Sequence, residues 1–123
     1  LMDVITAVCN GTVADLDIEL DTRAATTVVM ASGGYPVAHE TGFPISGIEA
    51  AEALGEVTVF HAGTNVKDGQ LVTDGGRVLA INAVGDDIRA SIDKAYEAVA
   101  KISFKDHYYR RDIGHRVLAR LEE

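Results

Sequence analysis

The sequence predicts an α+β domain, in which a mostly antiparallel sheet is packed against one amphipathic helix. Several short β-branched segments, an Asp-Gly turn signal and a single late helical stripe support this fold class. The chain has 123 residues, of which 47% are hydrophobic. This length and composition are sufficient for one domain with a real core and argue against disorder.

The first segment, residues 1–9, has an apolar helical pattern that stops at Asn10-Gly11, a common end of a helix. No capping Ser, Thr, Asp or Asn precedes it, so we expect the chain to be a fragment that begins inside an element of a longer protein. Cys9 is the only cysteine, which excludes an intrachain disulfide and a cysteine cluster for zinc. We expect Cys9 to be a small buried residue on this helix.

Two strands are expected next. Residues 16–21 alternate apolar and acidic side chains, a period of two that predicts a half-exposed strand. Residues 24–31 are β-branched or small and nearly uncharged, which predicts a central strand. After residues 32–36 the chain is expected to be irregular as far as Gly47, because glycines and a proline interrupt any regular pattern.

A hairpin is the strongest local prediction. A strand at 57–60 leads toward Asp68-Gly69, a dipeptide that favours a tight two-residue turn, and 78–84 forms the return strand. Centring the turn on Asp68-Gly69 predicts three cross-strand pairs: Lys67 with Gln70, Thr64 with Thr73, and His61 with Gly76. This register would bring a histidine, a glycine pair and an arginine together.

Helical signals surround and follow the hairpin. Residues 48–54 are expected to form a short helical turn, and Asp86-Asp87 is expected to cap a longer helix. Apolar residues of the longer helix fall on one stripe: Ile88, Ile92, Ala95, Tyr96, Val99 and Ile102. The tail is expected to be irregular over 108–115, with Tyr108 and Tyr109 as packing residues, before a short helix over 116–121.

Charge and hydropathy exclude several functions. The formal net charge is −8, which disfavours non-specific binding to nucleic acid or to anionic lipid. No apolar run reaches the roughly 18 residues that a membrane span requires, and no signal peptide opens the chain. A cytoplasmic protein without nucleic-acid or membrane partners is expected.

Three segments are candidate binding sites, and each also has a plain structural interpretation. Ser32-Gly33-Gly34-Tyr35-Pro36 could expose amide groups to a ligand, or could be only a turn at the end of a strand. Gly75-Gly76-Arg77 offers close approach and a planar fork for phosphate or carboxylate, or simply a surface arginine. His61 could bind substrate or exchange protons, or could be hydrogen-bonded at a strand end.

The remaining polar clusters carry weaker signals. Arg110-Arg111-Asp112 is either an anion clamp with its orienting carboxylate or an internal ion pair that pins the tail. Helix capping explains Asp86 and Asp87 better than catalysis does. The other histidines, His39, His107 and His115, lack the spacing of a metal site. The residues alone identify no catalytic group.

Taken together in order and spacing, three motifs resemble the C-terminal domain of the phosphoribosylamine–glycine ligase family. They are Met30 to Pro36; Phe60 to Thr64 with Asp74 to Leu79; and Tyr109 to Gly114. The resemblance covers about residues 1–114. It implies that 1–14 end an ATP-grasp region and that 15–123 form a C-terminal domain like that of biotin carboxylase.

The resemblance also implies an activity. Family members use ATP to join glycine to 5-phosphoribosylamine, which gives glycinamide ribonucleotide in purine biosynthesis. ATP and Mg²⁺ (or Mn²⁺) are expected to bind to upstream domains, against which this chain would pack, so the isolated chain is expected to be inactive. The segments 32–36 and 75–77 would close the substrate site, with Arg77 near an anionic group.

The sequence departs from the family at residues 37–42, where Val-Ala-His-Glu-Thr-Gly replaces a common run with Tyr and Lys before Gly. The course of that loop and any lysine contact are therefore not carried over. Two alternatives remain: a domain of another ATP-grasp enzyme such as a carboxylase, and a non-catalytic small-molecule binding module. The Arg-Arg-Asp-Ile-Gly tail argues against a carboxylase.

Overall fold

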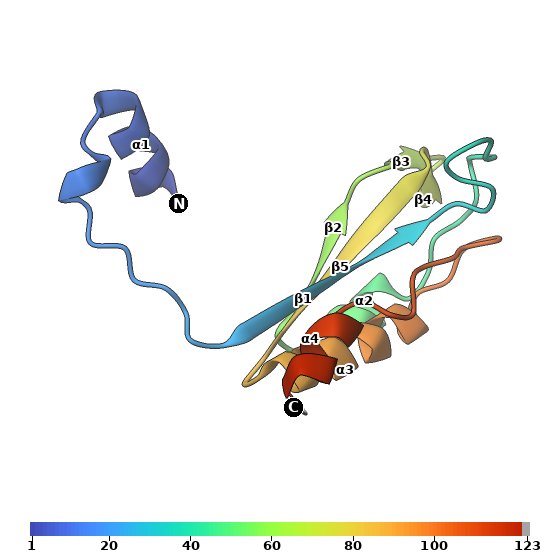
Figure 1. Cartoon of the computed structure of the whole chain (residues 1–123). Coiled ribbons are helices and arrows are strands. Elements are labelled where there is room, and N and C mark those ends of the chain that lie inside the picture. Colours follow the sequence, from blue (N-terminus) through green and yellow to red (C-terminus); the bar gives the residue numbers. More distant parts are fainter. Residues whose placement is uncertain (122–123) are drawn as a thin grey trace.

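The computed structural model describes residues 1–121 and shows an antiparallel sheet with helices on one face (Figure 1). Strands β1 (Ala24–Ala31), β5 (Arg77–Gly85) and β2 (Val57–His61) form a three-stranded sheet in the order β1-β5-β2. Strands β3 (Thr64–Lys67) and β4 (Gln70–Thr73) form a separate hairpin. The predicted α+β class with antiparallel pairing is confirmed, while residues 122–123 of the predicted domain lie outside the described residues.

The prediction that residues 24–31 form a central strand is wrong, because β5 is central and β1 lies at one edge. Side chains of β1 alternate between a buried face, which includes Val28 and Met30, and an exposed face, which includes Thr27 and Val29. The exposed face carries no charged residue. An edge strand with an uncharged outer face has the composition of a central one.

The core lies between the sheet and helix α3 (Ile88–Lys101), with the short helix α2 (Ile48–Glu52) beside it. The fully buried apolar residues of this core come from the sheet and from both helices: Val28, Met30, Ala51, Val78, Leu79, Ile81, Ala83, Ala95 and Ala98. Asp87 caps α3, because its Oδ1 accepts a hydrogen bond of 2.8 Å from the Ala90 amide. Both predicted helices and the predicted cap are confirmed.

The β3–β4 hairpin has the predicted register, with Lys67 opposite Gln70 and Thr64 opposite Thr73. The third predicted pair is wrong, because His61 lies opposite Leu79. The chain passes between the two ladders through 62–63 on the outgoing side but through 74–78 on the return side. The turn sets the register of β3 with β4. Because the two connections between the ladders differ in length, the register of β2 with β5 does not follow from that turn.

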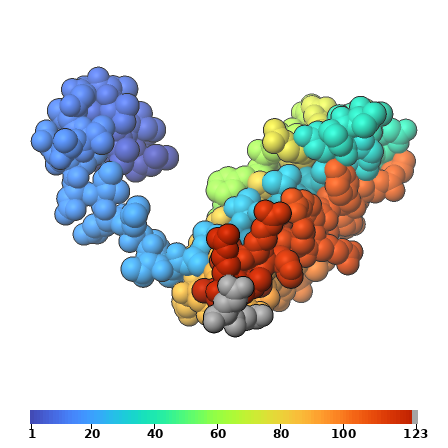
Figure 2. Space-filling view, viewed as in Figure 1, coloured from blue at the N-terminus to red at the C-terminus, as the bar shows by residue number. Residues whose placement is uncertain are grey.

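The N-terminal region is separated from the sheet (Figure 1). Helix α1 (Met2–Asn10) ends at Gly11 in the left-handed conformation, as predicted, and a 3₁₀ turn, η1 (Val13–Asp15), follows. The space-filling view shows this part as its own lobe on a thin connection (Figure 2). Cys9 is exposed, so the prediction of a buried cysteine is wrong, because α1 has no core beside it.

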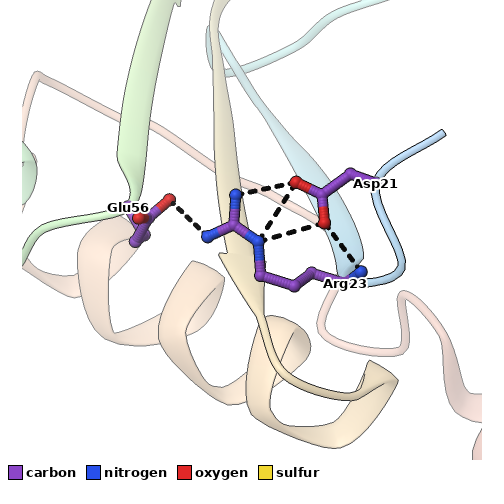
Figure 3. Close-up of polar contacts among 3 residues, drawn as sticks. All are labelled: Asp21, Arg23 and Glu56. Carbon is purple, nitrogen blue, oxygen red and sulfur yellow. Dashed lines mark hydrogen bonds and ion pairs between the residues drawn. The ribbon is translucent and has the colours of Figure 1, made fainter. Parts of the chain in front are cut away.

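The prediction of a strand at residues 16–21 is also wrong, because this segment is a connection that has no ladder partner within residues 1–121. Ion pairs hold the C-terminal end of this segment near the start of β2. Arg23 Nη2 lies 2.8 Å from Asp21 Oδ2, and its Nη1 lies 3.2 Å from Glu56 Oε2 (Figure 3). The hydrogen bonds from Arg23 lower the pKa of Asp21 from 3.8 to about 2.

The tail returns along α3 and ends in helix α4 (His115–Leu121), close to the predicted helix. The Tyr96 hydroxyl, from α3, donates to the Arg110 carbonyl at 2.8 Å and accepts from the Ile113 amide at 3.0 Å. The irregular part of the tail is thus pinned by one side chain. No helix within residues 1–121 combines the length and the apolar character of a membrane span.

Candidate functional site

Two of the predicted segments meet where β1 ends and β5 begins. Ser32 is buried, with 3% of its surface exposed. Its amide donates to the Gly76 carbonyl at 2.8 Å, and its Oγ donates to the Gly75 carbonyl at 2.8 Å. Ser32 therefore joins the loop of residues 32–36, here called the glycine loop, to the start of β5.

Glycine is required at two points of this junction because neighbouring groups come close. A Cβ on Gly76 would lie 2.1 Å from Cδ2 of the Tyr35 ring. A Cβ on Gly33 would lie 2.7 Å from Cβ of Asp106. Both distances are shorter than non-bonded carbon atoms show in proteins. The glycines therefore permit a packing that residues with a Cβ would disrupt.

Gly34 has a second reason to be glycine. Its φ of 85° lies in the left-handed region, and its carbonyl accepts from the amides of Val37 and Ala38. The Tyr35 amide donates to the Ser32 carbonyl at 3.2 Å, and the following Tyr35–Pro36 peptide bond is cis. The glycine loop is thus a compact turn with its own hydrogen bonds.

His61 lies at the same end of the sheet, although not in the predicted pair. Its side chain is exposed, and Nδ1 lies 3.1 Å from Thr64 Oγ1. The connection to the glycine pair runs through Gly63, whose amide donates to the Arg77 carbonyl at 2.9 Å and whose carbonyl accepts from Asp74 at 2.7 Å. Backbone contacts therefore bring together the region of His61 and that of residues 75–77.

Arg77 begins β5 and lies opposite Ala31, the last residue of β1. Its side chain is exposed. A guanidinium is a planar donor that suits phosphate or carboxylate groups. The start of β5 thus places an exposed arginine opposite Ala31, where β1 leads into the glycine loop.

Arg110 and Asp112 form an exposed ion pair, and both sequence interpretations of this cluster include such a pair. Arg110 Nη2 lies 2.7 Å from Asp112 Oδ2, and Nε lies 2.9 Å from Oδ1. The hydrogen bonds from Arg110 lower the pKa of Asp112, and the same bonds raise the pKa of Arg110. Arg111 lies over the Tyr109 ring, 5.7 Å from its centroid.

One contact residue was missed. Tyr108 was predicted to pack, but 43% of its surface is exposed, and its hydroxyl donates to the Tyr35 carbonyl at 2.8 Å. Tyr109 does pack against the core, as predicted. The two tyrosines are adjacent in an irregular tail, and no local pattern distinguishes their roles.

Two of the three scattered histidines contact aromatic side chains. His39 meets the Tyr35 ring edge-on at 6.2 Å, and His107 stacks on Tyr109 at 6.4 Å. Within the described part of the chain, no group of three or more His, Cys, Asp or Glu side chains is arranged to hold a metal ion.

The fold and this junction define a small α+β domain with a glycine-rich, cation-bearing edge. Residues 25–116 match the family model described as phosphoribosylglycinamide synthetase, C domain. The chain belongs to this family.

Named proteins of similar sequence are consistent with this family. The chain is 44% identical to a phosphoribosylamine–glycine ligase of Rhodopirellula baltica, over 96% of the chain and 27% of that protein. It is 44% identical to the trifunctional purine biosynthetic protein adenosine-3 of Gallus gallus, over 100% of the chain and 12% of that protein. The chain therefore spans about a quarter or less of these relatives.

A solved structure is also similar. The crystal structure of phosphoribosylamine–glycine ligase from Thermotoga maritima matches with a TM-score of 0.72 and 39% identity. The match covers 89% of this chain and 27% of that one. The fold and the sequence thus indicate the same family.

Proposed function

We propose that this chain is the C-terminal portion of an ATP-dependent ligase that joins glycine to 5-phosphoribosylamine and forms glycinamide ribonucleotide. The observation that carries the proposal is the 44% identity to a phosphoribosylamine–glycine ligase over 96% of the chain. In this proposal residues 1–14 end the ATP-grasp region and residues 15–123 form the C-terminal domain, with a fold like that of biotin carboxylase. The enzyme acts in the cytoplasm.

The role assigned to this chain is to hold substrate. The glycine loop and residues 75–77 close one wall of the site, and Arg77 binds an anionic group such as the phosphate of 5-phosphoribosylamine. ATP and Mg²⁺ or Mn²⁺ belong to the upstream domains, where the nucleotide supplies the phosphoryl group that activates the glycine carboxylate. The residues of this chain orient the amine substrate and limit its contact with water.

Substitution of Arg77 in the full-length enzyme tests this role. Arg77→Ala should raise the Michaelis constant for 5-phosphoribosylamine by about ten-fold or more, because a charge-assisted hydrogen bond contributes about 1.5–3 kcal/mol. Arg77→Lys should recover only part of the loss, since an ammonium lacks the planar fork. Arg116→Ala, on α4, is the matched control, and an unchanged constant in Arg77→Ala would reject the assignment.

The open face of the sheet supports packing against other domains. Val29, Ala80 and Phe60 are aligned in register across β1, β5 and β2. Val29 and Phe60 are 42% and 55% exposed, and they alternate along their strands with the buried core residues Val28 and Val59. In the full-length ligase this apolar row is a contact for the N-terminal or ATP-grasp domains.

Two experiments distinguish the proposal from its alternatives. The isolated chain, supplied with ATP, Mg²⁺, glycine and 5-phosphoribosylamine, should form no ADP, whereas the full-length protein should form glycinamide ribonucleotide. A carboxylase would instead consume bicarbonate in the full-length assay. A non-catalytic binding module would bind glycinamide ribonucleotide in calorimetry but show no turnover at full length.

A further inference from the structure

The segment that follows α3, residues 104–108, lies directly against the glycine loop, and we refer to it as the return segment. Tyr108 pairs with Ala31 like a short strand: the Ala31 amide donates to the Tyr108 carbonyl at 2.9 Å, and the Tyr108 amide donates to the Ala31 carbonyl at 3.0 Å. The return segment therefore continues the sheet at the residue where β1 gives way to the glycine loop.

The Tyr108 side chain reaches further into the loop than its backbone does. Its hydroxyl donates to the Tyr35 carbonyl at 2.8 Å. The Tyr35 ring in turn lies so close to Gly76 that a Cβ there would be 2.1 Å from the ring. Tyr108 holds the backbone of Tyr35, and Tyr35 covers the residue that precedes Arg77.

Other residues of the return segment contact the glycine loop and the residues that follow it. Asp106 lies against Gly33, where a Cβ would be only 2.9 Å from the Asp106 carbonyl oxygen. Lys105 Nζ lies 3.3 Å from Glu40 Oε2 and 4.3 Å from the centroid of the Phe43 ring. A hollow of about 340 Å³ remains between these groups.

The Tyr108 side chain contributes a hydrogen bond to the glycine loop more than it contributes buried surface. With 43% of its surface exposed, Tyr108 buries less than the fully packed aromatic residue Phe104, which is 5% exposed. Its specific contribution is one hydrogen bond between segments 73 residues apart. A phenylalanine would keep the ring and the backbone pairing and remove only this bond.

We propose that Tyr108 is a positioning residue for substrate binding: its hydroxyl fixes the glycine loop, and through Tyr35 it fixes the start of β5 beside Arg77. This inference rests on the proposed function. It adds a residue that makes no proposed contact with substrate and lies outside the motifs that carry the resemblance. The effect is expected on binding of 5-phosphoribosylamine, because the nucleotide is assigned to other domains.

The test uses the full-length enzyme with Tyr108→Phe, and with Tyr109→Phe as the matched control at the next residue. Tyr108→Phe should raise the Michaelis constant for 5-phosphoribosylamine by about five-fold, the factor expected for one ordinary hydrogen bond, and leave kcat and the constant for ATP within about two-fold. Amide hydrogen exchange at Tyr35, Val37 and Ala38 should become faster in Tyr108→Phe and stay unchanged in Tyr109→Phe.

Each outcome decides the proposal. Faster exchange together with the raised constant supports it. Unchanged exchange, an unchanged constant, or equal effects in the two variants would overturn it. A wild-type enzyme without ligase activity would refute the proposed function instead, and the exchange measurement would still decide whether Tyr108 holds the loop.

Discussion

The two ends of strand β1 are held by different kinds of interaction. At its start, Arg23 bridges Asp21 and Glu56 through ion pairs between exposed side chains (Figure 3). At its end, buried Ser32 and glycine contacts fix the chain against the start of β5. Exposed ion pairs are weak and screened by salt, whereas buried hydrogen bonds and tight contacts are not. The contacts of Ser32 at the loop end are therefore less sensitive to salt than the ion pairs of Arg23 at the start.

Gly76→Ala should produce the largest effect, because the new Cβ would lie 2.1 Å from the Tyr35 ring. Overpacking of this kind costs about 1–3 kcal/mol in the free energy of unfolding. Urea denaturation of the chain measures it. The control is the same substitution in a Tyr35→Ala background, where the cost should shrink. An equal cost in both backgrounds would show that the Tyr35 ring does not limit the site.

Ser32→Ala should come next. It removes the 2.8 Å hydrogen bond to the Gly75 carbonyl at a residue that is 3% exposed. The free energy of unfolding should fall by about 1 kcal/mol, because a partly buried carbonyl loses its donor. Thr27→Ala is the control, since it removes an exposed hydrogen bond to Asn82 and should change stability less. A larger loss at Thr27 would reverse the comparison of buried and exposed bonds.

Arg23→Gln should have a smaller effect, because it breaks only exposed ion pairs. The melting temperature should fall slightly in low salt, and the difference from wild type should diminish as salt is added. Thermal denaturation at two salt concentrations measures this. A loss that does not depend on salt would mean that Arg23 contributes by packing rather than by charge.

The smallest expected effect is the pH dependence of the contribution that Asp21 makes to the free energy of unfolding. Its pKa falls from 3.8 in the unfolded chain to about 2 in the folded one, so the folded state favours the ionised carboxylate. This contribution is complete above the unfolded pKa and is lost as the pH falls through about 2. The stability difference between wild type and Asp21→Asn should therefore disappear between these values. A difference that grows toward acid would contradict the assigned direction.

The sequence predicts most of the elements because their signals are local. The Asp68-Gly69 turn has φ values of 51° and 77°, as a two-residue turn of this kind requires. Asp87 and Gly11 mark helix ends in the expected way. These features depend only on nearby residues, so a single sequence contains the information.

The predictions are wrong where the structure of a segment depends on residues far away in the sequence. The alternation at residues 16–21 predicts a strand, but no strand in the described part of the chain pairs with it. The position of His61 depends on how 74–78 cross between ladders, which the turn does not control. The place of the glycine loop was predictable, but its contact with Tyr108 joins residues 73 positions apart and leaves no pattern in the sequence.

The uneven crossing between the ladders has a practical consequence for labelling. The β3–β4 hairpin keeps its own register, and its exposed tip at Asp68-Gly69 belongs to neither the three-stranded sheet nor the glycine loop. A short peptide tag at this tip would therefore leave the pairing of His61 with Leu79 intact. The hairpin thus offers an attachment point for a fluorescent label beside the three-stranded sheet.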